Sequence, residues 1–188
     1  MSDAKGVTPS WYAVDRVLLD PTIAGPDSLR RGVDFPPSLQ GQTIALLDIG
    51  KMRGNEFIDQ LEQSLNSMGY ETRRYAKPTN VKVAPVALLQ RIALEANVVV
   101  EALADCGSCT SCAIHDLNEL DLRHIPGLLI ATDEFQDAAR AQSGALGFAP
   151  GVIWVPHPIQ NRTRKELHLM ARQALPNILE SLQRPKEY

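Results

Sequence analysis

Residues 97–104 read NVVVEALA, and the chain runs from them directly into DCGSCTSC at residues 105–112. A short valine-rich run that ends in glycine and serine is typical of a buried strand followed by a turn. The next residues, 111–124, repeat apolar side chains at helical spacing. This stretch therefore predicts a strand, a tight turn and a helix, the unit from which parallel sheets are built.

The same alternation continues on both sides of this unit. Further segments of strand length lie at 43–50, 71–76, 127–132 and 151–156. Further helical patterns lie at 55–70, 84–96, 134–147 and 162–182. Pro176 is expected to kink the last helix. Five strands that alternate with helices predict a doubly wound α/β fold with a five-stranded, mostly parallel sheet and helices on both faces, either flavodoxin-like or Rossmann-like.

The first forty residues differ from the rest of the chain. Residues 1–40 hold several prolines and little apolar sequence, which predicts an extended N-terminal arm, whereas 41–188 form the α/β domain. Residues 11–19, WYAVDRVLL, are amphipathic and either cap the domain or reach a partner subunit. We therefore expect a homodimer or a larger oligomer.

Composition excludes several classes of partner and places the protein in the cytoplasm. A net charge of −3 over 188 residues argues against nucleic acid, and no apolar run is long enough to span a membrane. The N-terminus lacks the basic and apolar regions of a secretory signal. The chain has three cysteines, all between residues 106 and 112, which argues against a structural disulfide framework.

Polar and reactive side chains gather where the predicted strands end. In open parallel sheets, ligands bind at the carboxyl ends of the strands. The candidates there are Asp48, Lys51 and Asn55 after the first strand, Lys77 after the second, Asp105 to Cys112 after the third, Glu134 after the fourth and His157 after the fifth. We expect one edge of the sheet to bring together a base, acids, an imidazole and thiols.

The cysteines stand where a strand enters a helix. The partial positive charge of a helix N-terminus lowers the pKa of a thiol, so Cys106 is the expected nucleophile. Cys109 is spaced to resolve an adduct on Cys106, as in C-x-x-C redox pairs. Gly107 allows close backbone approach, Ser108 or Thr110 is expected to cap the helix, and a bound anion would use the same amides.

Other interpretations of these residues remain open. The cysteines are either reactive or simply buried, and burial is favoured for Cys112. With His115 they also form C-x2-C-x2-C-x2-H, but three-residue steps on a helix drift by ~60° each, so we assign no metal ligand. Lys51 either binds a substrate anion or is solvated. Glu134 either moves protons or complements a helix dipole, and His157 is held between two prolines.

Several motifs closely resemble the UGSC family of small bacterial proteins. They are LLDIGKMRGN (46–55), DCGSCTSCAIHDLNEL (105–120), HIPGLLIATDEF (124–135), ARAQSGALG (139–147) and VPHP (155–158). The likeness extends from Thr43 to about residue 180. It implies that Cys106 stands where family members can carry selenocysteine, and that Cys112 replaces a bulky residue, often tryptophan. More distantly, the region is similar to selenoprotein B of the glycine, sarcosine and betaine reductases.

We therefore expect a thiol-dependent, reductase-like enzyme in which Cys106 attacks a small electrophilic substrate and Cys109 resolves the adduct. An external thiol or thioredoxin-like reductant restores the pair, and no cofactor is expected. His157 or Glu134 moves protons. The substrate is expected to contact Asp48, Lys51, Asn55, Asp105, Gly107, Ser108 and Thr110. Two alternatives remain: a non-redox cysteine lyase or hydrolase, and a non-catalytic or metal-binding component of a larger complex.

Overall fold

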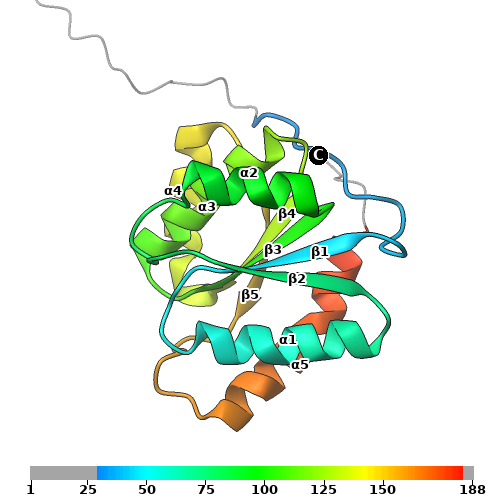
Figure 1. Cartoon of the computed structure of the whole chain (residues 1–188). Coiled ribbons are helices and arrows are strands. Elements are labelled where there is room, and N and C mark those ends of the chain that lie inside the picture. Colours follow the sequence, from blue (N-terminus) through cyan, green and yellow to red (C-terminus); the bar gives the residue numbers. More distant parts are fainter. Residues whose placement is uncertain (1–28, 184–188) are drawn as a thin grey trace, which may run out of the picture.

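The computed structural model describes residues 29–183, and Figure 1 shows its elements in chain order. They are β1 (Thr43–Asp48), α1 (Gly54–Ser67), β2 (Glu71–Ala76), α2 (Val86–Glu95), β3 (Val98–Ala104), α3 (Gly107–Asp121), β4 (Gly127–Thr132), η2 (Asp133–Phe135), α4 (Gln136–Leu146), β5 (Gly151–Val155) and α5 (Arg164–Ser181). Each predicted strand and helix is present within a few residues. No helix among the described residues is long and apolar enough to cross a bilayer.

The strands form one sheet in the order β2-β1-β3-β4-β5, and every neighbouring pair is parallel. This is the flavodoxin-like order, so the predicted fold class is confirmed and the Rossmann-like alternative is excluded. The sheet is wholly parallel because consecutive strands are joined by a helix, which carries the chain back to the end of the sheet where the previous strand began. The strand order reverses between β1 and β3, which makes the ends of these two strands the switch point of the fold.

Helices cover both faces of the sheet, as predicted (Figure 1). Helices α1 and α5 pack on one face, where Phe57 and Leu65 belong to the same core as Leu46 from β1. Helices α2, α3 and α4 pack on the other face, and there Leu47 belongs to the core. Adjacent residues of a strand point to opposite faces, so β1 contributes to both cores and reads as one continuous apolar run.

Capping sets the starts of two helices. α3 begins at Gly107, four residues earlier than the apolar spacing indicated, because Cys106 acts as its N-cap. α5 runs through Pro176 as one helix, and its start is set by a reciprocal capping box between Thr163 and Glu166. Capping therefore places both helix starts, which apolar spacing locates only approximately.

Residues 29–40 lie against the domain without regular secondary structure. Phe35 and Leu39 are buried in the core beneath α1 and α5. Arg30 lies over the ring of Phe148, with its guanidinium carbon 4.5 Å from the ring centroid, and forms an ion pair with Asp121 of α3. The rest of the predicted arm, residues 1–28, lies outside the described residues, and the division of the chain at residue 40 remains a prediction.

Candidate functional site

The thiols lie at the switch point of the sheet. Lys51 follows β1, and Asp105 and Cys106 follow β3, so the loops from the two sides of the reversal meet here. Between Glu101 and Ala104, β3 contains one residue more than the paired segment of β4, which is a β-bulge. Bulges redirect a strand end and are common beside functional sites.

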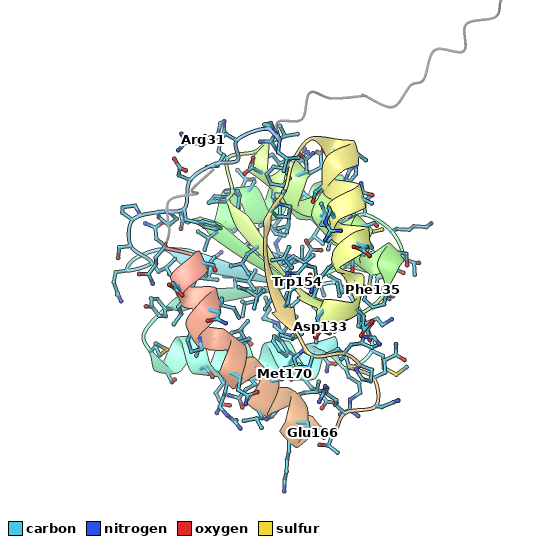
Figure 2. The ribbon with its side chains drawn as sticks, turned by 180° about the vertical axis from the view of Figure 1, so that it is seen from behind. Arg31, Asp133, Phe135, Trp154, Glu166 and Met170 are labelled. Carbon is cyan, nitrogen blue, oxygen red and sulfur yellow. The ribbon has the colours of Figure 1, made fainter. Side chains whose placement is uncertain are left out.

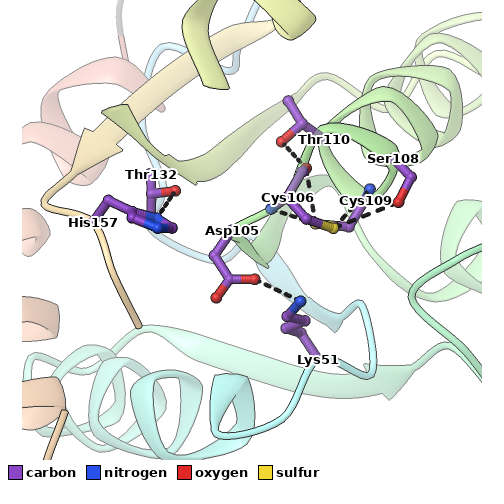
Figure 3. Close-up of polar contacts among 8 residues, drawn as sticks. All are labelled: Lys51, Asp105, Cys106, Ser108, Cys109, Thr110, Thr132 and His157. Carbon is purple, nitrogen blue, oxygen red and sulfur yellow. Dashed lines mark hydrogen bonds and ion pairs between the residues drawn. The ribbon is translucent and has the colours of Figure 1, made fainter. Parts of the chain in front are cut away.

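Cys106 and Cys109 cap the start of α3 through hydrogen bonds between each sulfur and the backbone amide of the other residue. The Cys106 sulfur accepts a hydrogen bond from the Cys109 amide at 3.3 Å, and the Cys109 sulfur accepts one from the Cys106 amide at 3.0 Å. The two Sγ atoms are 2.7 Å apart (Figure 3). The expectation that Ser108 or Thr110 caps the helix is wrong, because both sulfurs take the roles that serine and glutamate play in a capping box.

The same contacts separate the acidities of the two thiols. Burial raises the pKa of Cys106, but hydrogen bonds from Cys109 and Ser108 and the charge of Lys51 together bring it below its usual value. Burial raises the pKa of Cys109 to about 12, and the hydrogen bond to Cys106 acts in the same direction. Cys106 therefore ionises first, and Cys109 keeps its proton, with its thiol donating a hydrogen bond to the Cys106 carbonyl oxygen at 3.1 Å.

Lys51 and Asp105 form an ion pair next to the thiols. Lys51 Nζ lies 2.8 Å from Asp105 Oδ1, and the Asp105 side chain is 3% exposed (Figure 3). Gly50 positions the lysine: its φ is +78°, and a Cβ there would lie 3.0 Å from the carbonyl oxygen of Lys77. Burial lowers the pKa of Lys51, but the carboxylate of Asp105 raises it by a larger amount, so the net shift is upward. The ammonium therefore persists and compensates the Asp105 charge.

The remaining candidates on α3 have distinct surroundings. The Ser108 hydroxyl lies 3.5 Å from the Cys106 sulfur and is exposed. Thr110 is buried and donates a hydrogen bond to the Cys106 carbonyl oxygen at 2.8 Å. A Cβ on Gly107 would meet no atom within 4 Å, so no protein contact requires glycine there. Of these three, Ser108 alone contacts a reactive atom.

His157 belongs to a separate group at the same edge of the sheet. Its Nδ1 lies 3.1 Å from the hydroxyl of buried Thr132, and its amide donates to Asp133 at 3.1 Å. Its ring meets Phe135 edge-on, with centroids 5.5 Å apart. Glu134 in η2 is exposed. Within residues 29–183, the hydrogen bonds of His157 are with Thr132, Asp133 and Arg162, and none is with a thiol.

Asp48 and Asn55 lie on the β1 side of the site. Asp48 is buried and accepts a hydrogen bond from the Gly50 amide at 2.8 Å. Burial raises the pKa of Asp48, although this hydrogen bond lowers it in part. Asn55, in the first turn of α1, is exposed. Asp48 thus shapes the loop that carries Lys51, whereas Asn55 faces solvent.

The structure buries Lys77, a strand-end candidate, in a charged cluster beneath α3 whose two acids were missed in the sequence. Lys77, Glu101 and Asp116 have side chains that are at most 1% exposed, and Lys77 forms ion pairs with both acids. Both oxygens of Glu101 lack a hydrogen-bond partner within residues 29–183. Burial, followed by the charge of Asp116, raises the pKa of Glu101 well above the usual value. The available signal was a single acid inside the apolar run VVVEALA.

Cys112 adjoins this cluster rather than the reactive pair. It is half-buried one turn before Asp116, and burial raises its pKa, while the charge of Lys77 lowers it in part. His115 is half-buried, and its Nδ1 has no hydrogen-bond partner in the part of the chain that the structure describes. Among the described residues, neither side chain joins the group formed by Asp105, Cys106 and Cys109.

Two grooves flank β5, away from the thiols. One of about 430 Å³ lies between β5 and α4, and one of about 110 Å³ lies between β5 and α5. Trp154 lines both, and Met170 of α5 lines the smaller (Figure 2). Neither groove is lined by a candidate residue, so the candidate site is defined by its side chains and not by the size of a cavity.

The sequence matches the model of the UGSC family over residues 17–184. No curated protein shows significant similarity to the chain.

Among solved structures, the diflavin flavoprotein A3 of a Nostoc species is 10% identical with a TM-score of 0.46, over 76% of this chain and 94% of that one. An archaeal flavodoxin is 9% identical with a TM-score of 0.41, over 76% and 99%. The response regulator domain of Thermotoga maritima CheB is 11% identical with a TM-score of 0.42, over 76% and 97%. Such distant likenesses bear on no chemistry, and the fold assignment rests on strand order.

Proposed function

The chain belongs to the UGSC family, and we propose that it is a thiol-dependent oxidoreductase in which Cys106 attacks a small electrophilic substrate and Cys109 resolves the adduct. The observation that supports this most is the pair of sulfurs 2.7 Å apart at the N-terminus of α3. Their contacts lower the pKa of Cys106 and raise that of Cys109, so we assign Cys106 as the nucleophile and Cys109 as the thiol that stays protonated until the second step.

In the proposed first step, the Cys106 thiolate attacks the electrophilic atom and forms a bond to it. The leaving group departs with the electron pair of the broken bond and takes up a proton. In the second step, Cys109 loses its proton and attacks the Cys106 sulfur, so the disulfide forms while the bond to the substrate atom breaks. That atom keeps the electron pair and is protonated. Two electrons and two protons have then moved from the thiols to the substrate.

A reductant must then reopen the disulfide. We propose an external dithiol or a thioredoxin-like protein, which attacks one sulfur, reduces the pair to two thiols and leaves as a disulfide. This returns two electrons and two protons, so the cycle balances.

Lys51 contributes mainly through its charge. It is paired with Asp105, so a substrate carboxylate would compete with Asp105 for it, and Asn55 offers an amide at the solvent side. The positive charge favours the Cys106 thiolate and compensates the neighbouring acid. His157 and Glu134 contact neither thiol among the described residues, so proton transfer from them would run through substrate or water.

The proposal can be tested with dithiobis(nitrobenzoate), an aromatic disulfide that serves as a model electrophile. Reduced protein carrying Cys112→Ser should release two thionitrobenzoates for each reagent molecule and lose two hydrogens in the peptide holding Cys106 and Cys109. Adding Cys109→Ser should stop the reaction after one release, with the aryl group retained on Cys106. Adding Cys106→Ser instead should slow the first release.

Cys112→Ser alone is the matched control, because it removes a thiol from the same helix but not from the pair. Retention of the adduct by the protein that keeps Cys109 would refute resolution by that thiol. Equal rates of first release with and without Cys106 would refute its assignment as nucleophile. If the variant with Cys109→Ser turned over an ester or a similar electrophile repeatedly, the non-redox lyase or hydrolase would replace this proposal.

A further inference from the structure

Three side chains with metal-ligating atoms converge at the start of α3. One ligand atom from each of Asp105, Cys106 and Cys109 lies within 4.8 Å of the other two. Asp105 and Cys109 are buried and Cys106 is half-buried, so the group is enclosed on one side and open on the other. We propose that the reduced protein binds one thiophilic divalent cation, Zn²⁺ being the type case, through these three residues.

The donor set fits a zinc site with an open position. Two thiolates and one carboxylate are ligands that zinc accepts, and three protein ligands leave a fourth position for water or another small ligand. A tetrahedral site with Zn–S bonds of about 2.3 Å requires sulfurs ~3.8 Å apart. The present Sγ–Sγ distance is 2.7 Å, so the thiols must separate by roughly 1 Å. The open side at Cys106 permits this movement.

The backbone donates one hydrogen bond to each sulfur. The amide of Cys109 donates to the Cys106 sulfur, and the amide of Cys106 donates to the Cys109 sulfur. Such outer contacts orient metal ligands and stabilise their charged form. They are backbone groups of the α3 turn itself, so they remain available when a cation replaces the thiol proton between the sulfurs.

Charge balance includes Lys51. Two thiolates and one carboxylate carry three negative charges, and a divalent cation leaves one of these uncompensated. The Lys51 ammonium, 2.8 Å from Asp105 Oδ1, supplies the remaining positive charge. The complex with Lys51 is therefore neutral overall, which suits a largely buried site.

This ligand set differs from the one that spacing along the chain indicated. The pattern C-x2-C-x2-C-x2-H includes Cys112 and His115, but these lie further along α3 and outside the group. Asp105 is the third ligand in the proposed site because it lies between the end of β3 and the start of α3, next to both sulfurs. The inference also goes beyond the thiol reaction, since it needs only reduced sulfurs and no electrophile.

The test is a titration of anaerobically reduced protein with Zn²⁺ against a chromogenic chelator, combined with iodoacetamide labelling of Cys106. We expect one Zn²⁺ per chain, protection of Cys106 from alkylation, and no binding once the pair is oxidised. Asp105→Asn should weaken binding at least about tenfold. Cys112→Ser, His115→Gln and Asp137→Asn, a surface control, should bind as the unmodified protein does.

Cobalt substitution keeps the inference testable if Asp105→Asn fails to fold. Co²⁺ in the unmodified protein should give the visible bands of a tetrahedral site and sulfur-to-metal charge transfer of two thiolates. Charge transfer of three thiolates, or weakening by Cys112→Ser or His115→Gln, would assign the metal to the sequence pattern instead. If folded Asp105→Asn bound Zn²⁺ with unchanged affinity, Asp105 would not be a ligand and the two cysteines alone would account for the binding. Each of these results is independent of whether dithiobis(nitrobenzoate) is turned over.

Discussion

Two chemically identical thiols acquire different properties within one turn of backbone. Cys106 lies in extended conformation at the helix N-cap, half-exposed and surrounded by donors, whereas Cys109 is fully buried one turn later. Their mutual hydrogen bond stabilises a single negative charge on the pair, and position decides which sulfur carries it. A serine and a glutamate in the same capping arrangement would stabilise the helix equally well but would provide no thiol chemistry.

Replacing Lys51 by methionine should raise the pKa of Cys106 and slow its alkylation at neutral pH. The substitution removes a positive charge that favours the thiolate and leaves the Asp105 carboxylate uncompensated, and both changes disfavour a second negative charge. The rate of iodoacetamide labelling against pH, measured on a Cys109→Ser, Cys112→Ser background, reports the shift.

Lys165→Met, at an exposed position of α5, is the matched control and should leave the profile unchanged. Adding Asp105→Asn to Lys51→Met should recover part of the shift, because it removes the uncompensated carboxylate. If Lys51→Met labels with the profile of the parent protein, the lysine has no electrostatic influence on the thiol.

Single elements hold the site in place through their packing on one another. β3 is buried along its whole length and carries α3 directly from its end, so the thiol turn is anchored on the strand side. On the helix side, Asp116 of α3 pairs with Lys77 and accepts a hydrogen bond from the Ala84 amide at 2.7 Å. The segment after β2 is thereby tied to α3 one turn beyond Cys112.

Glu101→Gln should stabilise the protein at neutral pH but not at acid pH. Burial raises the pKa of Glu101 in the folded state, so folding favours its protonated form. Its stabilising effect is complete below the unfolded pKa and is lost as pH rises toward the folded pKa. Urea unfolding should therefore give similar stabilities near pH 4, and at pH 7 a gain for the glutamine variant of the order of 1 kcal/mol.

Glu119→Gln provides the comparison, since Glu119 is a half-buried acid of α3 that pairs with Arg123. It should be neutral or slightly destabilising at pH 7. A Glu101→Gln variant that loses stability at pH 7 would show that the carboxylate is charged and compensated by Lys77.

Gly127→Ala should destabilise the fold where β4 passes under α3. A Cβ at residue 127 would lie 2.3 Å from Val99 Cγ1 and 2.7 Å from Leu117 Cδ2, so strand and helix would have to separate. We expect a loss of about 1–3 kcal/mol in urea unfolding. Gly144→Ala is the opposite case: a Cβ within α4 meets nothing within 4 Å, and the change should stabilise by about 0.5–1 kcal/mol. Equal effects of the two substitutions would contradict this packing.

The whole domain includes more of the chain than the alternating strands and helices. Residues 29–40 cross the domain, with Arg30 against α3 and the α4–β5 loop at one end and Leu39 in the α1 and α5 core at the other. The match to the UGSC family begins at residue 17, also before the first strand. Residues 29–40 therefore pack as part of the domain.

Leu39→Ala should destabilise the protein by about 2–5 kcal/mol, because it removes a fully buried side chain and leaves a cavity. The next residue, Gln40, is exposed, so Gln40→Ala should change stability by less than about 0.5 kcal/mol. Thermal or urea unfolding of both variants measures the difference. If both were neutral, residues 29–40 would be a separable arm, as the proline content of residues 1–40 suggests.

The order and type of the elements follow from local sequence. Strand-length segments at 43–50, 71–76, 97–104, 127–132 and 151–156, with helical spacing after each, predict five strands and five helices, because periods of two and 3.6 bury different faces. Parallel pairing then places the strand ends at one edge, which is why the turn after residue 104 could be singled out as a candidate site.

The tertiary structure decided which residues meet at that edge. Strand order, which separates the flavodoxin-like arrangement from the Rossmann-like one, depends on contacts between distant segments and leaves no local period. The same is true of the Lys51–Asp105 ion pair and of the Lys77, Glu101 and Asp116 cluster, whose partners come from different strands and helices. Even between neighbours such as Cys106 and Cys109, the difference in pKa depends on burial and on a cation from another loop, which a linear pattern does not encode.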